Sequence, residues 1–75
     1  MHDRIKTIMA DVLEVEVAEI DDDFNPDSTD NWDSLRNLHL ITALEEEFGI
    51  TLTMSEIQGM VNFSEIVRVT ESHTG

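Results

Sequence analysis

The sequence predicts an all-α fold, a small four-helix bundle with a long acidic first loop and a short third helix. Two segments, residues 5–13 and 34–48, repeat apolar residues at the spacing of a helical face. Two more, "TMSE" at 53–56 and "NFSE" at 62–65, carry the Ser/Thr/Asn-x-x-Glu pattern that binds the free amides of a helix start. Residues 15–24 alternate apolar and acidic side chains, as in a strand, but the chain offers no second strand to pair with, so no sheet is expected.

The length and composition limit what the chain can do. Residues 1–75 are expected to form a single domain, because so short a chain has too few residues for two cores. A domain of this size buries only about 60% of the surface that its unfolded chain exposes, so a large enclosed active-site cleft is not expected. The absence of cysteine excludes disulfides, thiolate zinc sites and a side-chain thiol nucleophile. Any thiol chemistry would have to come from a cofactor.

The charge of the chain is strongly negative. Seventeen Asp and Glu residues against four Lys and Arg give a formal net charge of −13. This charge repels nucleic acids and anionic membranes and attracts basic protein surfaces, so proteins are the expected partners. The sequence shows no N-terminal signal sequence and no apolar run of about 18 residues. We therefore expect a cytoplasmic monomer without membrane insertion.

The first helix is predicted from one apolar face, with charged residues on its other sides. Its apolar positions are Ile5, Ile8, Met9, Val12 and Leu13. The stretch "VEVAEIDDDF" at 15–24 is expected to be an extended or turn-rich connection. It leads into "DDDFNPDSTDN" at 21–31, whose Asp, Asn, Ser and Pro residues favour a loop anchored by an inward Phe24.

The second helix is expected to run from Ser34 to Phe48, with Asp33 as its N-cap and Gly49 as a left-handed C-cap. One face is apolar and expected to be buried; it consists of Leu40, Ile41, Leu44 and Phe48. A second, partly apolar strip begins beside Ser34; it consists of Leu35, Leu38 and Thr42, alongside His39, Glu45 and Glu46. Either this strip docks a partner protein, or it reflects a wide buried face and ordinary exposed leucines.

Two shorter helices are expected after Gly49. The third is predicted over Ser55–Met60 and is weakened by Gly59. The fourth follows "NFSE" and is predicted to reach about Glu71. Its inward side chains are Phe63, Ile66, Val67 and Val69.

Ser34 raises the question of catalysis. A serine nucleophile needs a general base against its hydroxyl and an oxyanion hole. The nearest histidine, His39, falls on a different side of the helix, and the sequence has no Gly-x-Ser-x-Gly elbow. Catalytic residues are therefore not expected. Two explanations remain: Asp33 and Ser34 only start the helix, or another enzyme modifies an exposed Ser34, where the helix amides would favour a phosphate.

The acidic loop does not predict a specific metal site. Asp21, Asp23 and Asn25 match the first oxygen ligands of an EF-hand calcium loop. However, Pro26 stands where glycine is required, and Trp32 stands where the final glutamate is required. Only weak, nonspecific binding of divalent cations is expected from the charge. The histidines lie too far apart in the sequence for a local metal motif; they are His2, His39 and His73.

The stretches "DSL" at 33–35 and "LITALEEEFGI" at 40–50 carry a family resemblance. With them, the chain closely resembles the acyl carrier proteins, which are phosphopantetheine-binding carriers, from about Arg4 to Glu71. The resemblance implies that a phosphopantetheinyl transferase attaches the 4′-phosphopantetheine arm of coenzyme A to Ser34. The thiol of the arm would carry acyl groups as thioesters in fatty-acid, polyketide or related biosynthesis. The implied partners are acyl-loading, condensing and transferring enzymes with basic docking surfaces.

Other positions take roles from the same resemblance. Asp33 matches the acidic residue that precedes the modified serine in the family, and the resemblance implies that the transferase recognises this residue. Leu35 and Leu38 match apolar contacts for partner enzymes. Glu45 and Glu46 match an acidic docking strip.

Three positions depart from the family pattern. Arg36 and His39 stand where fatty-acid carriers usually have carboxylates, and Trp32 stands where a small residue is common. These departures predict a specialised or secondary carrier with its own enzymes. Simpler interpretations are that Trp32 packs at the rim of the bundle, and that Arg36 and His39 are solvated residues and do not determine partner choice.

Two alternatives to an acyl carrier stay open. One is an acidic helical adaptor, or a weak cation-binding protein, that uses Leu35 and Leu38 without a covalent arm. The other is an aminoacyl or peptidyl carrier. Peptidyl carriers often have His before the modified serine, so Asp33 favours acyl cargo.

Overall fold

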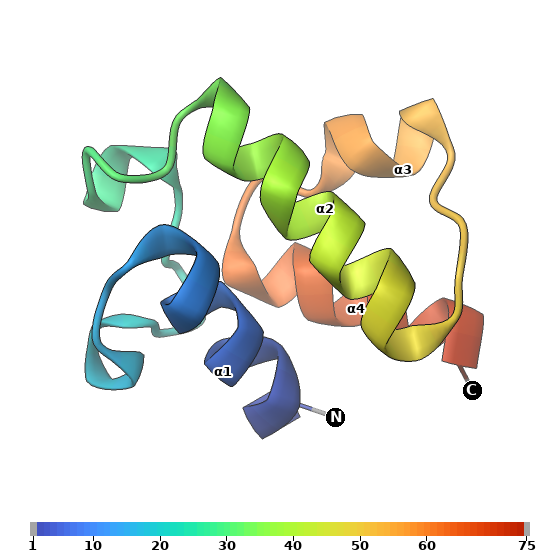
Figure 1. Cartoon of the computed structure of the whole chain (residues 1–75), viewed down its shortest axis with the longest axis horizontal. Helices are drawn as coiled ribbons and strands as arrows, with labels where there is room; N and C mark the ends of the chain where they lie inside the picture. Colours follow the sequence, from blue (N-terminus) through green and yellow to red (C-terminus); the bar gives the residue numbers. More distant parts are fainter. Residues whose placement is uncertain (1, 75) are drawn as a thin grey trace.

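The computed structural model describes residues 2–74 and contains helices and turns in this range, with no strand. The elements in chain order are α1 (His2–Leu13), η1 (Val17–Glu19), η2 (Pro26–Ser28), α2 (Ser34–Phe48), α3 (Met54–Gly59) and α4 (Phe63–Thr74). The predicted all-α class, with four helices and a short third one, is confirmed (Figure 1).

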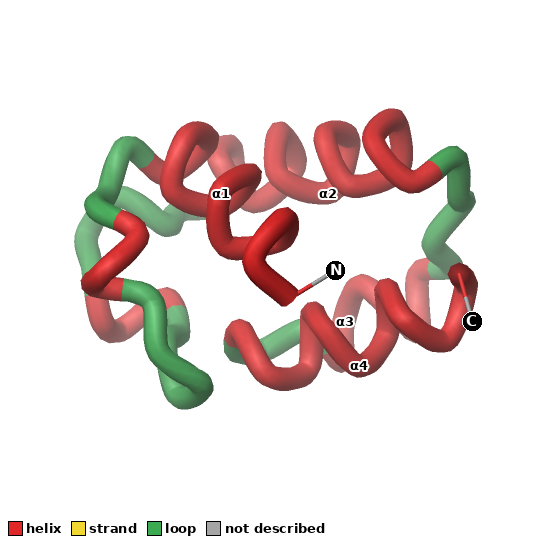
Figure 2. Tube along the Cα trace, turned by 90° about the horizontal axis from the view of Figure 1, so that it is seen from below, coloured by secondary structure: helices red, strands yellow, loops and turns green. Residues whose placement is uncertain are grey.

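The helices lie on different sides of α2. Figure 2 shows α2 along one side and α4 along the other, with α1 crossing in front of them. The long connection between α1 and α2 covers one end of the bundle, and it contains the two 3₁₀ turns η1 and η2. None of the helices within residues 2–74 is long and apolar enough to span a membrane.

The core lies where α1, α2 and α4 meet, and it buries most of the apolar positions expected from the helical spacing; Ile8 and Val12 of α1 pack against it but are only partly buried. The apolar helical side chains with no exposed surface are Ile5, Met9, Leu13, Leu40, Leu44, Phe63 and Ile66. Ile41, Val67 and Val69 are also buried. Phe48 was expected to be inside, but it is only partly buried because it lies in the last turn of α2, where fewer neighbours cover it.

Both ends of α2 are capped as predicted. Asp33 Oδ1 accepts a hydrogen bond from the backbone amide of Arg36 at 2.9 Å. At the other end Gly49 adopts φ 63°, a left-handed conformation that glycine reaches without strain. The helix begins at Ser34 and ends at Phe48, which are the predicted bounds.

The helix α3 covers Met54–Gly59, shifted by one residue from the predicted range of about Ser55–Met60. Its capping residue is Thr53, as the "TMSE" pattern predicts. Thr53 Oγ1 accepts a hydrogen bond from the Glu56 amide at 3.1 Å, and Glu56 Oε1 accepts one from the Thr53 amide at 2.9 Å. This reciprocal pair satisfies two amides at the helix start.

The fourth helix is longer than predicted. It begins after Asn62, whose Oδ1 accepts a hydrogen bond from the Glu65 amide at 2.8 Å, as the "NFSE" pattern predicts. It continues past the expected end at Glu71 to Thr74. His73, in this added turn, places Nε2 at 2.8 Å from Glu56 Oε2 of α3, so a contact between helices accompanies the extra length.

The acidic loop is bonded to the start of α4. The backbone amide of Phe63 donates to the Phe24 carbonyl at 2.9 Å, and that of Ser64 donates to the Asp22 carbonyl at 3.3 Å. These bonds satisfy two amides that a helix N-terminus leaves free. Phe24 is buried, so the predicted inward anchor of the loop is confirmed.

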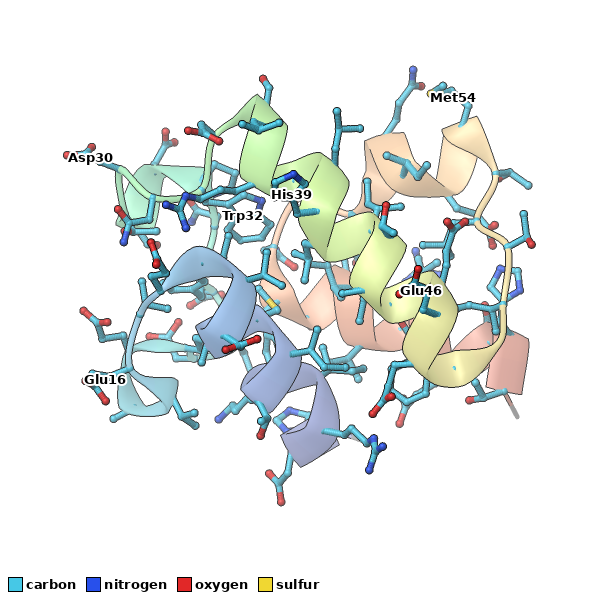
Figure 3. All side chains as sticks on the ribbon, viewed as in Figure 1. Glu16, Asp30, Trp32, His39, Glu46 and Met54 are labelled. Atoms are coloured by element: carbon cyan, nitrogen blue, oxygen red, sulfur yellow. The ribbon has the colours of Figure 1, made fainter. Side chains whose placement is uncertain are left out.

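Trp32 is part of the core, so its predicted place at the rim was wrong. Only 5% of its surface is exposed, and its ring stacks on that of Phe24 with a centroid distance of 5.8 Å. Figure 3 shows Trp32 directed inward, whereas Asp30 of the same loop points outward. Trp32 and Phe24 together fill the end of the bundle next to the first turn of α2.

Candidate functional site at the start of α2

Ser34 is exposed at the first position of α2. Within residues 2–74 its hydroxyl makes no hydrogen bond, because the capping bond comes from Asp33 instead. The positive end of the helix dipole and the free amides of the first turn lie beside it. Ser34 therefore offers an accessible hydroxyl in surroundings that favour a negatively charged substituent.

A catalytic arrangement around Ser34 is not found in the described part of the chain. His39 is exposed on α2 and makes no hydrogen bond there with the Ser34 hydroxyl. Residues 2–74 contain no cluster of three or more His, Cys, Asp or Glu side chains placed to hold a metal ion. The site can present a hydroxyl to another protein, but it has no base of its own to activate it.

The outward strip next to Ser34 is present as an exposed surface. Leu35 and Leu38 are 62% and 61% exposed, so both leucines lie outside the core. Thr42 is also exposed, and its hydroxyl donates to the Leu38 carbonyl at 3.0 Å. His39 and Glu46 project from α2 toward the viewer in Figure 3. The strip therefore combines apolar and polar side chains that are left exposed by the helices of residues 2–74.

Arg36 and Glu45 lie among the expected partner residues, but both make contacts within the chain. Arg36 Nη1 donates to the Val12 carbonyl at 3.0 Å, and Nη2 lies 2.8 Å from Glu14 Oε2. Glu45 Oε2 accepts a hydrogen bond from the Leu52 amide at 2.8 Å. These side chains connect α2 to the end of α1 and to the segment before α3.

All four Lys and Arg side chains have a partner within the described chain. Three of them form ion pairs with glutamates, and the fourth lies over an aromatic ring with 5.7 Å between Nζ and the ring centroid. The pairs are Arg4 with Glu47, Arg36 with Glu14, Arg68 with Glu65, and Lys6 with Phe63.

An open groove of about 330 Å³ lies beside Ser34. One wall is formed by Pro26 of η2 and by Trp32, and the other by Met60 and Val61 from the turn between α3 and α4. Asn37 lines the groove one helical turn after Ser34. The sequence offered no signal for the groove, because its walls come from three segments that only the tertiary structure brings together.

This site defines a class of protein. An exposed serine at a helix start, without a base or metal cluster but beside an apolar groove and an exposed strip, is suited to carry a group that another enzyme attaches. Similarity to known proteins supports this class. The chain matches the family described as "Phosphopantetheine attachment site" over residues 3–69.

Similar proteins point to the same family. The chain is 32% identical over 73 residues to an acyl carrier protein of Picosynechococcus, which covers 97% of this chain and 90% of the relative. It is 32% identical over 72 residues to an acyl carrier protein of Clostridium acetobutylicum, and the match covers 96% of this chain and 94% of the relative. Polyketide-8 synthase acyl carrier protein 2 of Streptomyces avermitilis is 29% identical over 73 residues, and the match covers 97% of this chain and 84% of the relative. The chain belongs to the phosphopantetheine-binding carrier proteins.

Membership establishes the cofactor and the general role. The cofactor is phosphopantetheine, and the protein is a carrier and not a catalyst. A carrier of this family requires a phosphopantetheinyl transferase and biosynthetic partner enzymes. The predicted family, cofactor and non-enzymatic role are thereby confirmed.

Proposed function

We propose that Ser34 is the attachment residue, and that the chain presents thioester-bound acyl groups to enzymes of fatty-acid, polyketide or related biosynthesis. The observation that carries the proposal is the exposed, unbonded hydroxyl of Ser34 at the first position of α2. A transferase can reach this oxygen without unfolding any part of the bundle. The attached group supplies the thiol that a chain without cysteine lacks.

Residues next to Ser34 support the attachment. Asp33 holds the first turn of α2 through its bond to the Arg36 amide, and the proposal also assigns it recognition by the transferase. The free amides and the dipole at this helix end stabilise the negative charge of a phosphodiester. The groove beside Ser34 leaves room for an arm to leave the attachment point.

The proposed docking surface is the outward strip, formed by Leu35, Leu38, His39, Thr42 and Glu46. The leucines supply apolar contact area, and the net charge of −13 favours partners with basic surfaces. Arg36 and Glu45 are left out of this surface, because their contacts lie within the chain.

Acyl cargo is favoured over aminoacyl cargo. The relatives described above are named acyl carrier proteins, and one belongs to a polyketide synthase. Asp33 before the serine agrees with this assignment. The specialised role inferred from Trp32, Arg36 and His39, the single domain, the monomeric state and the cytoplasmic location remain predictions.

The attachment is tested by incubating the apo protein with coenzyme A, magnesium and a broad-specificity phosphopantetheinyl transferase, then measuring intact mass. The wild type should gain one phosphopantetheine. Ser34→Ala should gain nothing. Ser55→Ala is the matched control, because Ser55 is also an exposed serine in the first turn of a helix, α3, and this variant should gain the full mass. A gain that survives Ser34→Ala would refute the assignment.

The docking surface is tested through the KM of the same transferase. Leu38→Ser should raise KM by roughly tenfold, because an apolar contact of about 1.4 kcal/mol is lost. Val17→Ser is the matched control, since Val17 is exposed but lies in η1, outside the strip. Equal KM values for both variants would argue against this surface. The competing adaptor hypothesis predicts that a partner enzyme binds Ser34→Ala as tightly as the loaded wild type.

A further inference from the structure

The groove beside Ser34 contains a hydrogen-bond donor that the fold does not use. The Trp32 indole N–H donates to Asn37 Oδ1 at 3.0 Å. Within residues 2–74 the Asn37 side-chain nitrogen makes no hydrogen bond. Asn37 is half-buried and lines the groove, so its side-chain nitrogen is not sealed inside the core. A donor is therefore available in a largely apolar groove.

The orientation of the Asn37 amide follows from its partner. An indole nitrogen only donates hydrogen bonds, so the atom facing it must be the amide oxygen. This removes the usual uncertainty between the two ends of an asparagine side chain. The NH₂ group must then be directed away from Trp32.

Trp32 keeps this donor in place. Its ring is buried and stacks on Phe24, whose backbone carbonyl is bonded to the Phe63 amide of α4. A donor fixed by a buried aromatic ring loses little conformational freedom when it binds a ligand. The Trp32 side of the groove is thus organised before any ligand enters it.

We propose that this groove binds the pantoyl part of the phosphopantetheine arm, which deepens the proposed function and rests on it. Asn37 is three residues after Ser34, so the two side chains share a helix face with about 5–6 Å between their Cβ atoms. The part of the arm next to the phosphodiester is the part held nearest to that donor. This part carries a carbon with two methyl groups and an amide carbonyl.

The walls of the groove match this chemistry. The two methyl groups suit the apolar side chains of Met60 and Val61 in one wall and Pro26 in the other, and the amide carbonyl accepts from Asn37 Nδ2. The acyl group at the far thiol end lies beyond this contact. The groove therefore orients the root of the arm toward the turn between α3 and α4, and leaves the thiol end free for partner enzymes.

The test uses the loaded protein, with labelled protein, an unlabelled arm and isotope-filtered NMR. The arm methyl protons should show NOEs to the Val61 methyl groups. The Asn37 side-chain amide protons should shift relative to the apo protein. Asn37→Asp keeps an oxygen for the Trp32 indole but removes the NH₂ donor, and it should weaken the NOEs at least severalfold. Gln58→Glu adds the same charge on exposed α3 and should leave them unchanged.

The outcomes separate this proposal from the attachment itself. Full loading by mass, with no NOE to the groove and an unchanged Asn37 amide, would overturn the groove while the attachment stands. NOEs that persist in Asn37→Asp would overturn the role of Asn37. A protein that gains no mass refutes the attachment, and the groove proposal fails with it. Circular dichroism confirms that each variant is folded.

Discussion

Two of the helices that lie beside α2, α1 and α3, are held in very different ways. On the α1 side, fully buried apolar side chains meet, and Arg36 adds bonds to the Val12 carbonyl and to Glu14. On the other side, none of the six residues of α3 is buried. This helix depends on its capping residues and on the buried Leu52 and Met60 at its flanks.

The groove beside Ser34 therefore has one firmly held wall, with Trp32, and one weakly held wall next to α3. Segments with few buried apolar contacts open at a lower free energy than the core. We therefore expect the α3 side, with Met60 and Val61, to move aside when an arm or a partner protein enters the groove. Substitutions on the two sides should therefore differ in their effect on the free energy of unfolding.

The largest effect is expected for Trp32→Ala, at the firm wall. Removing a buried Trp leaves a cavity and should lower the free energy of unfolding by about 3–5 kcal/mol. Ile57→Ala, at a partly buried position of α3, should lower it by only about 1–2 kcal/mol. Urea unfolding followed by far-UV circular dichroism measures both, since Trp32 is the only Trp. Equal losses would remove the contrast between the two walls.

A smaller loss is expected for Arg36→Met. The bond to the Val12 carbonyl is charge-assisted and only partly exposed, so its removal should lower the free energy of unfolding by about 1–2 kcal/mol. The ion pair with Glu14 adds little, because the Glu14 side chain is largely exposed. Arg68→Met is the control, an exposed pair within one helix, and should change stability by at most about 0.5 kcal/mol. The same urea titration compares them.

Gly59→Ala should strengthen the weak wall. No atom lies within 4 Å of an added Cβ, and the residue is not in the left-handed region. We expect a gain of about 0.5–1 kcal/mol and slower amide exchange in α3. Gly49→Ala, which also meets no atom but has φ 63°, should instead lose about 1 kcal/mol. Destabilisation by Gly59→Ala would show that α3 needs a flexible end.

The smallest effect concerns pH and Glu56. The Thr53 backbone amide, helped by His73, lowers the pKa of this carboxyl below its ordinary value of 4.5, although burial opposes the shift. The folded state thus favours the ionised form. The contribution of the ionised Glu56 carboxylate to the stability of the fold is present above about pH 4.5 and is lost as the pH falls through the lowered pKa.

The measurement compares urea midpoints of the wild type and Glu56→Gln from about pH 6 to about pH 3. The wild type should lose its advantage over the variant toward the acid end. A difference between the two that stays constant with pH would show that Glu56 does not stabilise α3 through its charge.

Local patterns predicted much of this structure. The spacing of Leu40, Ile41 and Leu44 predicted the buried face of α2, and Asp33 and Gly49 predicted its ends. These features depend on neighbours within a few residues. The exposed leucines were predicted for the same reason.

The contacts that the sequence did not predict join distant residues. Arg36 bonds to a carbonyl 24 positions earlier, and Trp32 is buried by a loop that folds back onto α4. Met60 and Val61 reach the groove only because the turn between α3 and α4 lies beside the start of α2. A one-dimensional pattern does not record which segments meet, so neither the groove nor the role of Asn37 followed from it.

The pairing of every Lys and Arg within the chain has a consequence for crowded solutions. With its cations already matched to its own groups, a copy has little positive charge to offer another copy, and two copies approaching each other repel. At high concentration the net charge of −13 therefore disfavours association between copies of the chain, and a basic surface on an enzyme is the better electrostatic partner for each copy.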